Sequence, residues 1–132
     1  MLLDNCSLPG GGIDFKNRGE MGSGHGWGMG WAVAWNCVAK SFVIQQPPGA
    51  YNWAIGCVGM RESLPRPFEN GPKLPEGTFD SPGQPVAPGS LYLAQLKERL
   101  GVQALRNIGY STDSSEAAQV APPNGFPKVQ VE

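Results

Sequence analysis

Three short segments of similar sequence decide the fold: Leu2-Leu3-Asp4-Asn5-Cys6-Ser7-Leu8, Val33-Ala34-Trp35-Asn36-Cys37-Val38-Ala39 and Trp53-Ala54-Ile55-Gly56-Cys57-Val58-Gly59. Each is rich in β-prone residues and is bounded by Gly, Pro or Asn, which is typical of a short strand. The cysteines stand at positions 6, 37 and 57, so the intervals are 31 and 20 residues. A recurrence on this scale is typical of stacked repeats, as in a solenoid or a parallel β-helix.

A parallel stack explains why Asn and Cys recur together. Equivalent residues of successive coils lie about 4.8 Å apart, so we expect the small cysteines to stack inside and the asparagines to stack at a corner. Asn suits a corner because its amide satisfies backbone groups and because it tolerates left-handed backbone angles. Further strands are expected at 12–16 and 41–46, with corners at 9–11 and 47–49. The extra length of the first interval, at 19–30, predicts a loop that leaves the stack.

Composition restricts the class of protein. The chain has 132 residues, which fits one domain or a piece of one. Gly (19) and Pro (13) are abundant, which is common in disordered chains. Disordered chains are also rich in charge and poor in aromatic residues. Here charged residues are only 16% and aromatic residues reach 9%, so we favour short extended segments joined by turns. The net charge of −1 disfavours nucleic acid as a partner. We expect no membrane span, and the first residues lack the features of a signal peptide.

The cysteines predict buried thiols more readily than a metal site. No pair has C-x-x-C spacing and the chain has a single His, so we expect no zinc site and no other metal site. The alternative to three buried thiols is one disulfide with a leftover thiol. The Gly-rich stretch 22–31 lacks the order of residues of a phosphate-binding P-loop.

The sequence changes in character after the coils, which we place at 1–60. In 61–89, seven prolines oppose sustained strand pairing or helix, so this segment is expected to run extended over a surface. Ser90 as N-cap and an apolar stripe of leucines predict a helix ending near Gly101, and the helical region is expected over 90–108. Residues 109–132 are expected to form a flexible tail.

Several motifs, taken in order, resemble the C-terminal part of bacterial secreted right-handed parallel β-helix proteins of the pectate-lyase-like superfamily. They are Gly24-His25-Gly26-Trp27, Trp35-Asn36-Cys37, Gln46-Pro47-Pro48-Gly49-Ala50, Asn52-Trp53-Ala54-Ile55-Gly56-Cys57 and Ser90-Leu91-Tyr92-Leu93-Ala94-Gln95-Leu96. The resemblance covers roughly residues 2 to 108. It implies an extracellular or periplasmic setting and a carbohydrate-related role, without a catalytic assignment.

A mainly β fold, a right-handed parallel β-helix of few coils, is therefore expected. Because repeat stacks need about three units and capped ends, we expect the chain to be the C-terminal end of a longer solenoid, or its first coil to be covered by another subunit. The proline-rich segment and the helix would then wrap the stack or cap its far end.

Candidate site residues cluster around the Gly-rich stretch. Alternating glycines would place the remaining side chains of 22–31 on one face if the stretch were extended. Candidate substrate-binding residues are Trp27, Trp31, Lys16 and Arg61, and candidate catalytic residues are His25, Glu20, Asp14 and Arg18. Asp14 and Glu20 form the one sensible carboxylate pair for a glycosidase. The simpler alternative is that Trp27 and Trp31 cover the core.

Three functions remain open from the sequence. The first is a structural segment of a secreted carbohydrate-active protein that contributes part of a polysaccharide-binding groove. The second is a polysaccharide lyase or glycoside hydrolase whose decisive residues lie mostly upstream. The third is a structural cell-surface or assembly module without a ligand. No cofactor is expected in this chain, and any Ca²⁺ would belong to the parent protein.

Overall fold

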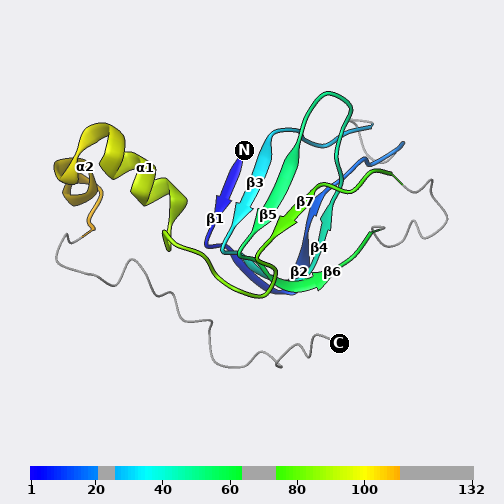
Figure 1. Cartoon of the computed structure of the whole chain (residues 1–132), viewed down its shortest axis with the longest axis horizontal. Coiled ribbons are helices and arrows are strands. Elements are labelled where there is room, and N and C mark those ends of the chain that lie inside the picture. Colours follow the sequence, from blue (N-terminus) through cyan, green and yellow to red (C-terminus); the bar gives the residue numbers. More distant parts are fainter. Residues whose placement is uncertain (21–25, 64–73, 111–132) are drawn as a thin grey trace.

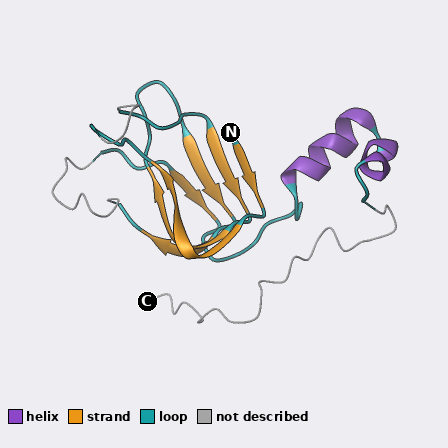
Figure 2. Ribbon diagram, turned by 180° about the vertical axis from the view of Figure 1, so that it is seen from behind, coloured by secondary structure: helices purple, strands orange, loops and turns teal. Residues whose placement is uncertain are grey.

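The computed structural model describes residues 1–20, 26–63 and 74–110, which form a mainly β structure with parallel sheets and two short helices (Figures 1 and 2). The strands are β1 (Leu2–Asp4), β2 (Ser7–Phe15), β3 (Ala32–Trp35), β4 (Val38–Ile44), β5 (Asn52–Ile55), β6 (Val58–Arg61) and β7 (Thr78–Asp80). The helices are α1 (Leu91–Leu100) and α2 (Val102–Asn107).

The strands pair in parallel in two sheets. One sheet has the order β1-β3-β5-β7 and the other has the order β2-β4-β6. The chain therefore visits the two sheets alternately, and each strand pairs with the strand two places further along the sequence. Val33 lies opposite Trp53, so the offset between β3 and β5 is 20 residues. The second and third cysteines are separated by the same interval.

The chain crosses from one sheet to the other at each cysteine, and the hydrogen bonds repeat there. The amide of Asn5 donates to Trp35 O, that of Asn36 to Ile55 O, and that of Gly56 to Asp80 O, all at 2.9 Å. On the other side of the corner, Cys6 O, Cys37 O and Cys57 O each accept from the next rung. The prediction that the three cysteines occupy equivalent positions of a parallel ladder is confirmed.

The corner residues adopt the left-handed backbone that the bend requires. Asn5, Asn36, Gly56 and Ser81 have φ values of 54°, 49°, 65° and 48°, so the predicted role of the asparagines is confirmed. The corner expected at 9–11 is wrong, because these residues lie inside β2 and a register shift against β4 absorbs them. The turn at 47–49 is confirmed, with Gly49 at φ 70°.

The apolar core lies between the sheets. Phe15, Phe42 and Ile44 are its largest fully buried side chains, with small alanines from β3 and β5 facing them. The three cysteines are free thiols, as predicted, with Cys37 and Cys57 buried and Cys6 half-buried. The hydrogen bond with Cys57 and then burial raise the pKa of Cys37, and burial raises the pKa of Cys6.

Thiol labelling is expected to follow this order of burial. Because the thiolate is the reactive form, a maleimide should modify Cys6 in the folded protein, while Cys37 and Cys57 react only after unfolding in denaturant. Mass spectrometry of labelled peptides measures this directly, and a Cys6→Ser variant sets the background. Rapid labelling of Cys37 without denaturant would contradict the buried ladder.

The segment 83–89, which we call the corner segment, returns across the corners from the last rung to the first. Gly83 donates to Cys57 O, and the Asn36 side chain bonds to Val86 and Gly89. Asn5 Nδ2 then donates to Gly89 O at 2.7 Å. These bonds hold the corner segment against the corners of the first two rungs.

The corner segment leads into α1, which projects with α2 beside β1 (Figures 1 and 2). Ser90 is the N-cap as predicted, because its hydroxyl accepts from Leu93 N. The carboxylate of Asp4 also accepts from Leu91 N and Tyr92 N, and so anchors the first turn of the helix to the first strand. The helix therefore starts beside β1, at the first rung, and not at the far end of the stack, which was one of the two expected positions.

The region 61–89 differs from its prediction in one further respect. Instead of running only over a surface, it contributes β7, which pairs in parallel with β5. This strand fits because the interval between Pro75 and Pro82 is free of proline, so its amides can join the ladder. Most of the tail expected at 109–132, and part of the proline-rich stretch, lie outside the described residues.

Candidate functional site

The two described ends of the loop between β2 and β3 run antiparallel and are hydrogen-bonded to each other. Asn17 and Trp27 form an antiparallel bridge, and Gly28 N donates to Lys16 O. The backbone of Arg18 is also tied to the returning strand through Gly26 O at 2.7 Å. Within the described residues 26–31 the chain is not one extended face, since Gly26 and Trp31 both have positive φ; residues 22–25 of the stretch lie outside the described residues.

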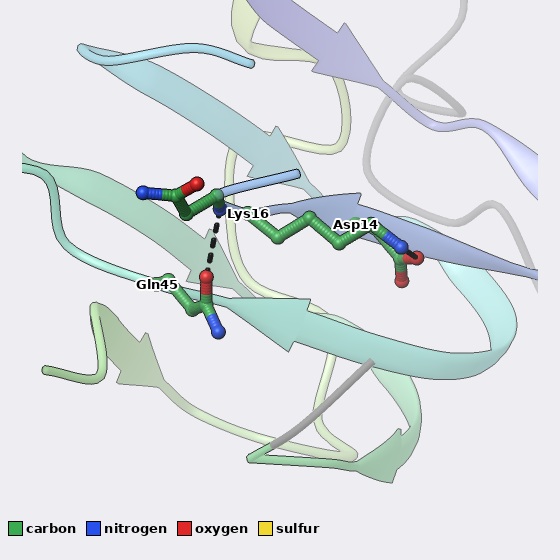
Figure 3. Close-up of polar contacts among 4 residues, drawn as sticks. Asp14, Lys16 and Gln45 are labelled. Atoms are coloured by element: carbon green, nitrogen blue, oxygen red, sulfur yellow. Dashed lines mark hydrogen bonds and ion pairs between the residues drawn. The ribbon is translucent and has the colours of Figure 1, made fainter. Parts of the chain in front are cut away.

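Asp14 and Lys16 are brought together at the end of β2. Lys16 Nζ lies 2.8 Å from Asp14 Oδ2 (Figure 3). The Lys16 side chain is 18% exposed and the Asp14 side chain 33% exposed. The neighbouring backbone is fixed by Gln45, a buried residue whose Oε1 accepts from Asn17 N at 2.8 Å (Figure 3). The ion pair satisfies the charge of Asp14 and leaves Lys16 with a carboxylate partner inside the chain.

Arg61 is also engaged with a carboxylate. Its Nε donates to Glu76 Oε1 at 2.7 Å and its second nitrogen donates to the other oxygen, which makes a bidentate pair. The guanidinium carbon lies 4.5 Å from the centre of the Phe79 ring, at the β7 end of the core. The hydrogen bond with Glu76 raises the pKa of Arg61 further. This geometry is typical of an arginine whose guanidinium covers an aromatic ring at the end of an apolar core.

Three aromatic side chains gather on the outer face of the β1-β3-β5-β7 sheet: Trp31, Tyr51 and Trp53, which we call the aromatic trio. The ring centroids are 5.5 Å apart for Trp31 and Tyr51, 5.9 Å for Tyr51 and Trp53, and 6.1 Å for Trp31 and Trp53. Trp31 is 59% exposed and Tyr51 47% exposed. Since large aromatic residues usually serve burial, a cluster this exposed is the strongest candidate for a binding surface.

The backbone around Asn52 fixes the trio in place. Asn52 lies in the sequence between Tyr51 and Trp53, and its side chain is fully buried. Its Oδ1 accepts from Ala32 N at 3.0 Å, and its Nδ2 donates to Gln45 O at 2.9 Å and to Met29 O at 3.3 Å. One amide therefore ties β5 to the turn before it and to the segment that carries Trp31.

The other end of the same sheet face is covered. Trp35 Nε1 donates to Pro88 O at 2.8 Å, so the corner segment occupies the surface beyond Trp35. The trio lies at the end where the strands begin, and the corner segment lies at the end where they finish. The open part of the face is thus the part that carries the aromatic rings.

The structure brings together some of the predicted site residues and separates others. Of the predicted substrate-binding residues, Trp31 belongs to the trio, whereas Trp27 pairs with Asn17 in the loop and Lys16 and Arg61 are held in ion pairs. Glu20 and Arg18 are exposed residues of the loop, Asp14 is paired with Lys16, and His25 lies outside the described residues.

Tyr51 and Trp53 were missed as candidate site residues. A signal for them was present, since the 20-residue repeat places position 51 beside position 31 and position 53 beside position 33. Trp31 and Tyr51 are indeed hydrogen-bonded neighbours, with Trp31 N donating to Tyr51 O at 2.7 Å. The repeat, applied to the tryptophans as well as to the cysteines, would have indicated the trio.

Two negative findings apply to the described part of the chain. Within it, no three residues among His, Cys, Asp and Glu lie close enough to hold a metal ion. Neither of its helices is long and apolar enough to cross a membrane.

Comparisons of the chain with protein-family models, with curated proteins and with solved structures find no match. The resemblance to bacterial β-helix proteins therefore remains a hypothesis that rests on the quoted motifs and on the parallel sheets.

Proposed function

We propose that the chain is a segment of a right-handed parallel β-helix from a secreted, carbohydrate-active protein, and that it binds polysaccharide through the aromatic trio. Support for the β-helix comes from the parallel pairing of both sheets and from the repeated hydrogen bonds at the cysteine corners. Such a protein would work outside the cytoplasm, in an extracellular or periplasmic setting.

The observation that carries the binding proposal is the exposure of the trio. The C–H groups of a sugar ring are weakly positive and are attracted to the negative face of an aromatic ring. Trp31 and Tyr51 are fixed at their backbones and keep about half of their surface in water. A rigid, exposed aromatic surface binds with little loss of side-chain freedom, as a binding module requires.

The state of the candidate catalytic groups favours binding over catalysis in this chain. A lyase needs a base and a cation for the substrate's carboxylate, and a glycosidase needs two carboxylates that face one bond. Here Asp14 and Lys16 neutralise each other, and Arg61 is held by Glu76. If the parent protein is a polysaccharide lyase or glycoside hydrolase, its catalytic groups belong elsewhere in that protein.

The edge position of the first rung, β1 and β2, supports the proposal that the chain is part of a longer assembly. Strands β1 and β2 lie at corresponding edges of the two sheets, and an edge strand presents unpaired backbone groups. Leu3 and Cys6 contact the core there but are only partly buried. We propose that more coils of the same β-helix, or another subunit, cover this edge, which is also the surface that a structural module would use.

Affinity electrophoresis in gels that contain soluble polysaccharides tests the binding function. We expect the 132-residue chain to be retarded by at least one polymer. Trp31→Ala and Tyr51→Ala should each weaken binding about tenfold, as expected for exposed aromatic residues central to a binding surface. Tyr92→Ala is the matched control, because Tyr92 on α1 is 51% exposed and lies outside the trio. Equal mobility of all four proteins in every gel would refute the proposal.

A further inference from the structure

Charged side chains are scarce in the segments that build the aromatic trio. The stretch 26–60, which builds the trio and the rungs that hold it, contains one charged residue, Lys40. Lys40 lies on β4, in the other sheet. The segments that pack beside Trp31 are also uncharged, since Gly30 lies against Ala50 and Pro47. The terminal ammonium of Met1 lies beside Trp31, where it donates to Trp31 O at 3.2 Å and is thus engaged by the backbone. The side chains that a ligand meets on the trio are therefore mainly aromatic and apolar.

The two cations that were predicted to bind substrate are already held in ion pairs within the protein. Recognition of a carboxylate polymer uses Arg or Lys side chains that are able to pair with its anionic groups. Among the predicted substrate-binding residues, Lys16 is paired with Asp14 and Arg61 with Glu76. Breaking either pair to bind a uronate would leave a carboxylate of the protein without its cation, so the exchange gains little.

Charged positions on the trio's own sheet face are acidic. The outward column at the far end of the strands runs Asp4, Trp35, Ile55 and Asp80 in register. Asp4 is neutralised in part by the first turn of α1. Asp80 is exposed, and together with the net charge of −1 its carboxylate disfavours the approach of an anionic chain.

The rings of the trio are tilted against one another. The interplanar angle is 29° between Tyr51 and Trp53, 39° between Trp31 and Trp53, and 60° between Trp31 and Tyr51. A flat crystalline surface touches several rings at once only when the rings are coplanar. Tilted rings instead suit a single chain whose sugar rings turn from one residue to the next.

We infer that the trio recognises single, soluble chains of an uncharged polysaccharide, and not uronate polymers or crystalline polysaccharide surfaces. This inference rests on the proposed binding function and adds the class of ligand. Within the described residues, the pairing of Lys16 and Arg61 and the scarcity of charged side chains beside the trio select against acidic chains, and the tilt of the rings selects against flat surfaces.

Affinity electrophoresis with matched polymers tests the inference. The gels contain soluble neutral polymers (hydroxyethyl cellulose, arabinoxylan and galactomannan) or polygalacturonate, and a parallel sedimentation assay uses crystalline cellulose. We expect binding to at least one neutral polymer that is about tenfold tighter than to polygalacturonate, with most of the protein left in solution above crystalline cellulose. The neutral binding should be lost in Trp31→Ala/Tyr51→Ala and kept in Tyr92→Ala.

The possible outcomes separate the inference from the function on which it rests. Binding to polygalacturonate that is as tight as to any neutral polymer, and that is lost in the double variant, overturns the inference while keeping the binding function. Retention on crystalline cellulose through the same residues also overturns it. If no polymer retards the protein, or if the double variant binds as the parent does, the proposed function itself fails.

Discussion

Asn52→Ala is expected to lower the free energy of unfolding by about 4 kcal/mol, the largest effect among the substitutions considered. The side chain is fully buried and serves three backbone groups: Ala32 N, Gln45 O and Met29 O. Removing it leaves these groups without a partner away from water, at about 1–3 kcal/mol for each buried group. Urea unfolding followed by circular dichroism measures the change.

A matched control separates the loss of these bonds from the loss of an amide in general. Asn107, at the end of α2, is an exposed residue that accepts one hydrogen bond from Gln103. Asn107→Ala should change the free energy of unfolding by less than about 0.5 kcal/mol, as surface substitutions usually do. A similar small loss for Asn52→Ala would mean that the buried amide does not hold the segments together.

The same substitution connects stability with the candidate site. Because Asn52 holds the segments that carry Trp31 and Tyr51, its loss should loosen the trio before the sheets separate. The near-ultraviolet circular dichroism of the aromatic rings should weaken in Asn52→Ala under conditions where the far-ultraviolet signal persists. This result would show that the position of the rings depends on the buried Asn52 amide more than on contacts between the rings, and an unchanged near-ultraviolet signal would show the opposite.

Much of the β architecture could be predicted because its signal is periodic. Each corner requires a residue that tolerates positive φ, followed by a small apolar side chain. The pair Asn-Cys meets both requirements, and it recurs at equivalent rungs. The fourth rung was missed because it uses Ser81 and Pro82 where the earlier rungs have Asn or Gly followed by Cys. The backbone geometry at this corner is kept although the residues differ.

The position of the helices could not be predicted, because it depends on a contact distant in sequence. The cap and the stop of α1 are local signals, and both are confirmed at Ser90 and Gly101. The place where the helix docks is set by Asp4, 87 residues before Leu91. No local pattern around Asp4 distinguishes a helix anchor from an ordinary charged strand residue.

The candidate site was predicted in part for a related reason. Alternating glycines indicated one extended face for Trp27 and Trp31, but Gly26 and Trp31 have positive φ, and Trp27 pairs with Asn17 in the loop while the Trp31 ring contacts Tyr51. Trp31 instead meets residues from the next rung. A surface made across rungs becomes visible only when the repeat is applied to every position.

Asn36→Ala is expected to lower the free energy of unfolding by about 3 kcal/mol and to release the corner segment. The side chain accepts from Val86 N at 2.8 Å and donates to Val86 O at 2.8 Å and to Gly89 O at 3.0 Å. Each of these bonds contributes about 1 kcal/mol. The residue also sits at φ 49°, a conformation that Ala adopts less readily than Asn.

Comparison with Asn36→Gly separates the two contributions. Glycine loses the same hydrogen bonds but adopts positive φ without strain, so this variant should be about 1 kcal/mol more stable than Asn36→Ala. Both variants should be cut faster than the parent by a protease at 83–89, because the corner segment has lost its bonds to the second rung. If the corner segment stays protected in both variants, its attachment comes from Asn5 and Trp35, and the central role of Asn36 is wrong.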